Sequence, residues 1–185
     1  MTISRDFFAQ DAVSVARGLI GAELCIDGVG GRIVETEAYD AGDPASHSFG
    51  GATKRNAAMF GPVGHAYVYR IYGLHWCLNF VCAQDQPGSA VLIRAVEPLS
   101  GIDVMRARRG AIADRLLCSG PGRLAQALGV DAALDGAPLD QSPFALTAPD
   151  TPSRIVAGPR IGITKAAATP WRFCLAGSRY LSKPV

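Results

Sequence analysis

The sequence predicts an α+β fold, with mixed helices and strands: one curved, mainly antiparallel β-sheet carrying a protruding β-hairpin and flanking helices. The chain has 185 residues, 49% of them hydrophobic, which is enough for one sizeable core. Its β-prone runs follow one another across short turns and do not alternate regularly with helices, so a βαβ architecture is not expected. No internal repeat and no Pro-, Gly- or Ser-rich linker divides the chain. Residues 1–185 are therefore expected to form a single domain.

The first forty residues favour a helix followed by a hairpin. AVSVARGLI, preceded by Asp11 as a candidate N-cap, predicts a helix over 11–20 that ends at Gly21. The hairpin covers 22–39 and consists of AELCI, a DGVG turn, and a strand from Arg32 to Tyr39.

Later elements are read from the same signals. A long glycine-rich loop over 40–64 is of a length usually associated with function or disorder. Two β-prone runs in 65–83 flank Tyr72, Gly73 and Leu74 and predict a second hairpin with these residues at its tip. The remaining expected elements are a strand over AVLIRAV, helices over 99–109 and 121–128, and short β-like runs at FALTA, RIVA, RIGI and WRFCLAG.

Composition narrows the class of protein. The N-terminus MTISRDFF has neither the charged nor the apolar region of a signal peptide, and no apolar stretch is long enough to cross a bilayer. The five cysteines are scattered without CxxC spacing, which favours reduced, mostly buried thiols and argues against a zinc site. We expect a cytoplasmic protein, nucleoid-associated if bacterial, that is not secreted and holds no metal. The net charge of +2 does not by itself indicate a nucleic-acid binder, and the arginines over 106–115 fit a solvated helix face at least as well as a basic patch.

The strand RIVETEAY raises the main chemical question, because it carries two carboxylates. Alternation along a strand places Glu35 and Glu37 on the same face. Like-charge repulsion would raise the pKa of one of them, which suits acid or base chemistry near neutrality. The alternative is that both glutamates pair with arginines on a half-exposed strand.

Four further positions attract attention from their surroundings. Asn79 and Arg94 lie among apolar neighbours, so each needs a hydrogen-bonding partner if buried, and a strand glutamate would satisfy Arg94. Tyr72 beside the turn glycine presents a flat ring that could wedge between stacked bases, or could fold back onto the sheet. His47 is either an exposed loop residue or a hydrogen-bonding group of a site.

Seven stretches, in order along nearly the whole chain, resemble the alkyladenine (3-methyladenine) DNA glycosylase family, the monofunctional methylpurine DNA glycosylases. They are RIVETEAY, SHSFGG with TKRNAAMF, GPVGHAYVYRIYGLHWCLN, VLIRAVEPL, SGPGRLAQALG, PRIGI and PWRF. The resemblance implies base-excision repair: a damaged purine is flipped out of duplex DNA and its N-glycosidic bond is hydrolysed, which leaves an abasic site. It implies no cofactor, and it implies alkylated adenine or guanine as substrate, with hypoxanthine or ethenoadenine as further candidates.

The same resemblance implies roles for eight residues. Glu37 matches the general base that activates water, Arg94 the arginine that helps hold this water, and the backbone at Ile161 the rest of the water's cage. Tyr39, His47 and Tyr69 match residues that contact the flipped base, and Asn79 matches one that disfavours guanine. Tyr72 matches the side chain that fills the gap in the duplex. Glu35 has no implied role.

Two other functions fit the residues. A hydrolase of free nucleosides could use the same carboxylate without an exposed wedge, and a non-catalytic module could bind damaged DNA without releasing a base. The expected partner is damaged double-stranded DNA, bound by a monomer.

Overall fold

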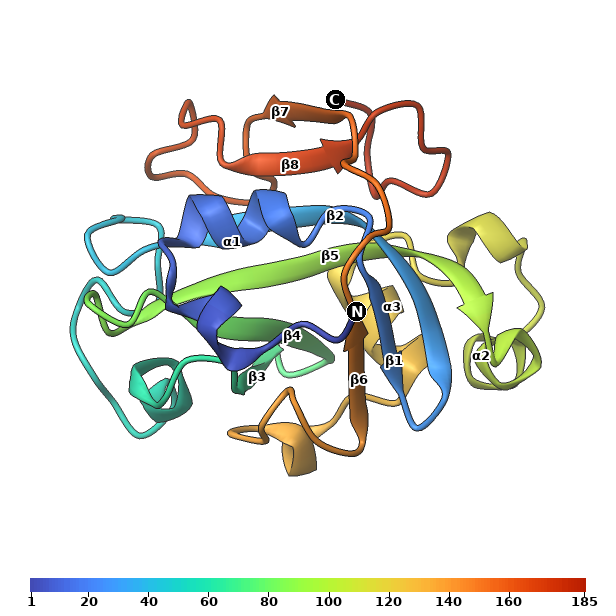
Figure 1. The fold of residues 1–185 in the computed structure, drawn as a ribbon, viewed down its shortest axis with the longest axis horizontal. Helices are drawn as coiled ribbons and strands as arrows, with labels where there is room; N and C mark the ends of the chain where they lie inside the picture. Colours follow the sequence, from blue (N-terminus) through green and yellow to red (C-terminus); the bar gives the residue numbers. More distant parts are fainter.

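The core of the protein is a sheet of eight strands, all paired antiparallel, in a computed structural model that describes residues 1–185 (Figure 1). The strand order is β3-β4-β5-β2-β1-β6, and β8 pairs with both β2 and β7. The strands are β1 (Glu23–Ile26), β2 (Val29–Tyr39), β3 (Ala66–Ile71), β4 (His75–Cys82), β5 (Ser89–Ser100), β6 (Phe144–Thr147), β7 (Ile155–Gly158) and β8 (Arg172–Leu175). The helices are α1 (Ala12–Gly18), α2 (Ile102–Arg109) and α3 (Pro121–Leu128). The predicted α+β class is confirmed.

Strand β2 is the central element of the sheet. It pairs with β5 on one side, and on the other side it pairs first with β1 and then, at its second half, with β8. It begins at Val29, earlier than the predicted Arg32, because Asp27 and Gly28 alone form the turn, both with positive φ. Gly31 allows β2 to lie close against β5, since a Cβ at this position would lie 2.0 Å from the carbonyl oxygen of Glu97 on β5.

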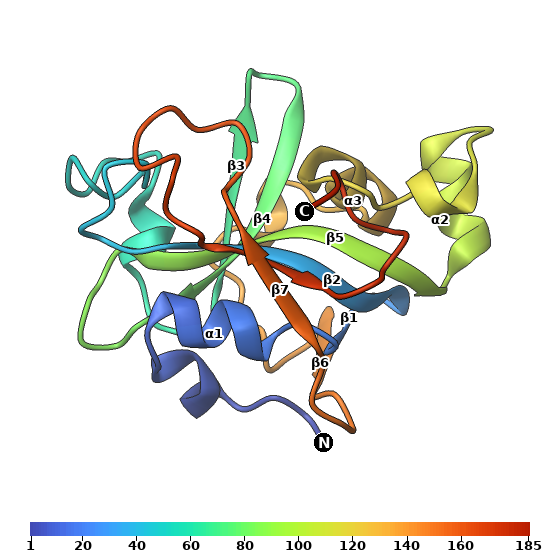
Figure 2. The same ribbon diagram turned by 90° about the horizontal axis from the view of Figure 1, so that it is seen from above.

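Helices cover both faces of the central strands. Helix α1 lies on one side and α3 on the other, so β4 and β5 are buried along most of their length (Figures 1 and 2). The side chain of Asp11 accepts a hydrogen bond from the backbone N–H of Ser14, as expected of an N-cap, and α1 ends at Gly18 rather than at 20. Helix α3 has the predicted bounds, with Gly129 after its last residue.

The hairpin predicted over 65–83 is formed by β3 and β4, and it projects beyond the rest of the molecule (Figure 2). Tyr72 and Gly73 make its turn, and both have positive φ, 52° and 67°. Tyrosine rarely adopts this conformation, whose strain is of order 1–2 kcal/mol. Tyr72 is 85% exposed and Leu74 71% exposed, so the ring does not fold back onto the sheet.

Two predicted elements are wrong in part. The helix expected over 99–109 begins only at Ile102, because Ser100 still pairs with Gly30 of β2 and Gly101 turns the chain with a φ of 66°. The β-like run RIGI, 160–163, forms no strand, because Arg160 is drawn into a buried ion pair instead. The short elements at FALTA, RIVA and WRFCLAG are strands β6, β7 and β8.

Candidate active site

All eight residues singled out by the sequence line one cavity of about 300 Å³. They are Glu37, Tyr39, His47, Tyr69, Tyr72, Asn79, Arg94 and Ile161. The cavity lies between the β3–β4 hairpin, the central strands β2 and β5, and the segment 161–163. Apolar side chains such as Met59 and Leu92 complete its walls. None of the three lysines takes part in the lining.

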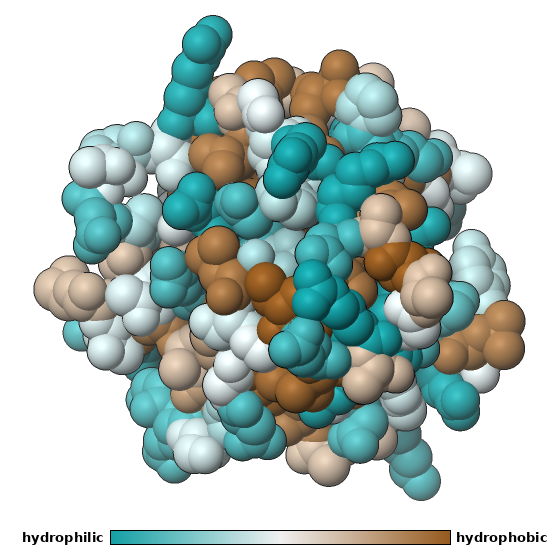
Figure 3. Space-filling model, turned by 90° about the vertical axis from the view of Figure 1, so that its right-hand side faces the viewer, coloured by the Kyte–Doolittle hydropathy of each residue, from teal (hydrophilic) through white to brown (hydrophobic).

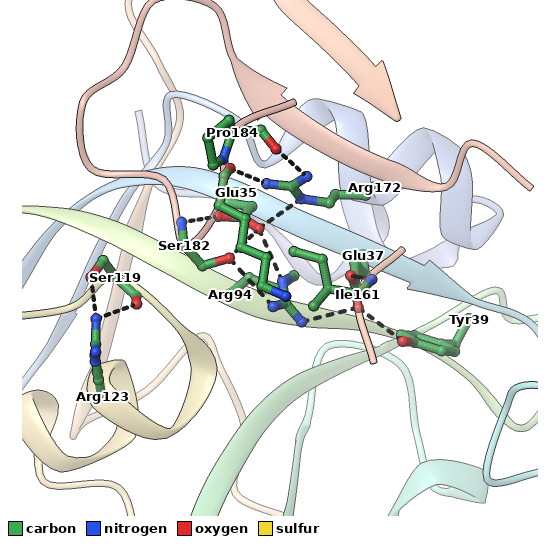
Figure 4. A network of polar contacts seen from close by, with 11 residues as sticks. Glu35, Glu37, Tyr39, Arg94, Ser119, Arg123, Ile161, Arg172, Ser182 and Pro184 are labelled. Carbon is green, nitrogen blue, oxygen red and sulfur yellow. Dashed lines mark hydrogen bonds and ion pairs between the residues drawn. The ribbon is translucent and has the colours of Figure 1, made fainter. Parts of the chain in front are cut away.

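Glu37 is a buried carboxylate in the wall of this cavity. Its side chain has no exposed surface although it contributes to the cavity wall. Three donors converge on the carboxylate: the backbone N–H of Ile161 at 2.7 Å from Oε1, and the Tyr39 hydroxyl at 2.8 Å and Arg94 Nη1 at 3.3 Å from Oε2 (Figure 4). These bonds fix the position of the carboxylate within the wall.

Glu35 points to the same side of β2 as Glu37, as the alternation predicts, since Arg94 contacts both carboxylates. The ion-pair alternative assumed a half-exposed strand. That assumption is wrong, because both glutamates are completely buried. Burial raises the pKa of Glu35, but hydrogen bonds from Ser182 and the charges of Arg94 and Arg172 outweigh it, so its pKa is lowered. Glu35 is therefore a fully paired carboxylate, not the raised member of a repelling pair.

Aromatic rings form the wall contributed by the hairpin and the loop. The His47 and Tyr69 rings meet edge to face with centroids 4.5 Å apart, and Tyr67 lies 5.4 Å from Tyr69. His47 Nδ1 is 3.0 Å from the Tyr67 hydroxyl, which holds the imidazole in place. Burial, and then the nearby Arg55, lower the pKa of His47, which favours the neutral imidazole near pH 7.

Asn79 and Arg94 have the hydrogen-bonding partners that their apolar neighbours demand. The Asn79 side-chain amide donates to the backbone carbonyl of Tyr67 at 3.1 Å, which holds the side chain in one orientation. Arg94 lies between the two glutamates, as expected of an arginine in an apolar strand.

Four polar residues near the site were missed by the sequence reasoning. Arg160 pairs with Asp43, both fully buried, and its guanidinium lies over the Tyr39 ring at 4.6 Å. Arg172 and Ser182 bind Glu35. The signal for Arg172 was present, because an arginine within the apolar run WRFC needs a partner as much as Arg94 does.

The expected arginine cluster over 106–115 divides into two groups. Arg106 is neutralised by Asp103 and Asp114, which agrees with a solvated helix face. Arg109 has no acidic partner, and with Arg123 it lines a cavity of about 330 Å³ at the start of α3. On the side of the molecule seen in Figure 3, hydrophobic residues form separate patches among hydrophilic ones.

No three His, Cys, Asp or Glu side chains gather closely enough to hold a metal ion. None of the helices has the length and apolar character needed to span a membrane. All five cysteines are free, and four of them are buried.

Comparison with known proteins gives the family. Residues 6–179 match the family model of methylpurine-DNA glycosylase. A protein of Nitrosospira multiformis is 62% identical over 96% of this chain and 92% of its own, and one of Rhizobium meliloti is 62% identical over 99% and 97%. A protein of Agrobacterium fabrum is 58% identical over 98% and 92%. Each of the three is provisionally named a 3-methyladenine DNA glycosylase. The chain belongs to the methylpurine-DNA glycosylase family.

Proposed function

We propose that this DNA glycosylase takes an alkylated purine such as 3-methyladenine out of duplex DNA and hydrolyses its N-glycosidic bond with a water activated by Glu37. One observation carries the proposal: a fixed, buried carboxylate lines an aromatic cavity beside a hairpin that exposes a tyrosine at its tip. Substrate sites commonly combine a largely apolar cavity with a few placed polar groups.

The carboxylate has room for the proton that a general base must accept. An ionised carboxylate offers about four acceptor positions, and Ile161, Tyr39 and Arg94 occupy three of those on Glu37. The fourth is free for a water O–H. Arg94, held against Glu37, orients this water and restrains the carboxylate. The backbone at Ile161 fixes the other carboxylate oxygen.

The bond changes follow from this arrangement. The C1′–N bond breaks with its electron pair going to the base, and the sugar develops positive charge that Glu37 stabilises. The water oxygen then bonds to C1′ while its proton passes to Glu37, which leaves a free base and an abasic site. Alkylated purines that carry positive charge become neutral on leaving. No lysine lines the cavity, which favours water over an amine as the nucleophile.

Extruding the nucleotide costs a few kcal/mol, and two features offset that cost. Stacking on Tyr39, Tyr69 and His47 returns about 1–3 kcal/mol per base. Tyr72, exposed and held outward by its turn, fills the gap left in the duplex. The unneutralised Arg109 and Arg123 line a cavity with His75, the first residue of β4 after the hairpin turn, and supply positive charge for the phosphate backbone.

The first experiment measures base release from a duplex methylated with a labelled methyl donor, followed by alkali to cut abasic sites. We expect labelled free base and alkali-dependent cuts from the wild-type protein, and no release from methylated nucleosides. Release from nucleosides at a comparable rate would favour a nucleoside hydrolase. Binding of the duplex without release would favour a damage-binding module.

Tyr72→Ala is expected to lower the single-turnover rate on duplex DNA about tenfold or more, because the extruded state loses the ring that stabilises the gap. Rates with a lesion in single-stranded DNA would change little. Tyr72→Phe retains the ring and serves as the matched control, so it is expected to act like wild type. Equal loss on single-stranded and duplex substrates would contradict the wedge role.

A further inference from the structure

Glu35 is the centre of a buried polar network behind the Glu37 carboxylate (Figure 4). Its Oε1 accepts hydrogen bonds from Arg94 Nε at 3.0 Å, Arg172 Nε at 2.8 Å and the Ser182 hydroxyl at 2.7 Å. Its Oε2 accepts one from the backbone N–H of Ser182 at 2.6 Å. Residues from β2, β5, β8 and the segment 182–184 therefore meet on one side chain.

Arg94 is held by this network at three points. Its Nε binds Glu35 and its Nη1 binds Glu37, while its Nη2 donates to the Ser182 hydroxyl at 3.3 Å. The Ser182 hydroxyl thus accepts from Arg94 and donates to Glu35. It is the one group that joins the two ends of the Arg94–Glu35 pair, and it fixes the guanidinium plane that reaches Glu37.

Arg172 anchors the segment that carries Ser182. Its Nη1 and Nη2 donate to the backbone carbonyls of Pro184, at 3.2 Å, and Lys183, at 2.5 Å. Arg172 is 3% exposed, so these bonds form away from solvent. With two carboxylates and two guanidinium groups, the cluster has no net charge, which a buried cluster requires.

We infer that Ser182, with Glu35 and Arg172, is a positioning group that orients Arg94 and through it the Glu37 carboxylate for base release. The inference rests on the proposed role of Glu37 and adds residues for which the sequence gives no role. Arginine has several rotatable bonds, so an arginine that orients a water must be held by a second layer of contacts. Segment 182–184 supplies that layer from the far end of the chain.

Ser182→Ala is a mild probe of this arrangement. It removes the hydroxyl and frees Arg94 Nη2, but the backbone N–H of residue 182 still binds Glu35 and Arg172 still holds the next two carbonyls. We expect the single-turnover rate of base release to fall about tenfold, the factor that corresponds to one buried hydrogen bond to a charged group. Binding of a duplex with a tetrahydrofuran abasic analogue, and the unfolding temperature, should stay at wild-type values.

Two variants separate positioning from general structural damage. Ser182→Thr keeps the hydroxyl and is expected to restore most of the rate. Ser178→Ala removes a hydroxyl four residues before Ser182 that bonds only the Tyr180 backbone N–H, and it should leave the rate unchanged. A wild-type rate for Ser182→Ala would overturn the inference. So would a loss that Ser182→Thr does not restore, or one matched by Ser178→Ala.

Glu37→Gln in the same assay distinguishes a failure of the positioning role of Ser182 from a failure of the proposed role of Glu37. If Glu37→Gln abolishes release and Ser182→Ala does not slow it, only the positioning role fails. If Glu37→Gln releases bases at the wild-type rate, the proposed mechanism fails and the positioning role fails with it.

Discussion

Glu37→Gln is expected to lower the single-turnover rate of base release by about a thousandfold or more. A positioned general base raises the reaction rate about 10²–10⁴-fold. The substitution also removes the negative charge that stabilises the positive charge developing on the sugar. The glutamine side chain fits the same space. Its NH₂ group is itself a donor, however, so in either orientation it faces another donor, the Ile161 N–H or Arg94 Nη1, and one hydrogen bond is lost. Release is measured with excess protein on the methylated duplex, and binding with the tetrahydrofuran duplex.

The matched control for this variant is Glu23→Gln on the exposed part of β1. It removes the same charge far from the cavity, so rate and binding should stay within about twofold of wild type. A Glu37→Gln protein that binds the duplex and releases nothing agrees with the mechanism. Equal release by wild type and Glu37→Gln would place the base elsewhere.

Local patterns predicted the elements whose formation depends on neighbouring residues. The hairpin tip at Tyr72–Gly73 and helix α3 are determined by β-prone runs, a turn glycine, Pro121 and Gly129, all within a short window. The start of α2 was misplaced because β5 extends to Ser100, which pairs with Gly30 of β2, 70 residues earlier in the chain. Such pairing leaves no local sign.

In the site, too, local patterns predict some features, and contacts between distant segments decide the others. Parity along β2 predicts that Glu35 and Glu37 face one way, and apolar surroundings predict that Arg94 has a buried partner. The contacts that decide the state of Glu35 come from Arg172 and Ser182, 137 and 147 residues away, and no spacing rule brings these segments together. Only the fold shows that Glu35 is neutralised rather than repelled by its neighbour.

Asp43→Ala is expected to lower the free energy of unfolding by about 3–5 kcal/mol, the usual cost of leaving a buried charge without its partner. Asp43 binds both Nη atoms of Arg160, and both side chains are shielded from solvent. Arg160 Nε is already buried without a hydrogen-bond partner. Without Asp43, the guanidinium would retain only its hydrogen bond to the Ala38 carbonyl. Urea unfolding measures the change.

Asp40→Ala is the control in the same loop, because the Asp40 side chain only accepts a hydrogen bond from the Gly42 backbone N–H near the surface. This substitution should lower the free energy of unfolding by about 1 kcal/mol or less.

A double variant tests whether the cost at Asp43 comes from the unpaired charge of Arg160. If it does, Arg160→Met added to Asp43→Leu should recover much of the stability, since apolar groups of similar size can replace a buried pair. Base release need not recover with it. Arg160 lies between the Tyr39 ring at 4.6 Å and the Trp171 ring at 5.3 Å, so the double variant removes the support behind an aromatic wall of the cavity. A double variant as unstable as Asp43→Ala would mean that loop packing, rather than the unpaired charge, sets the cost.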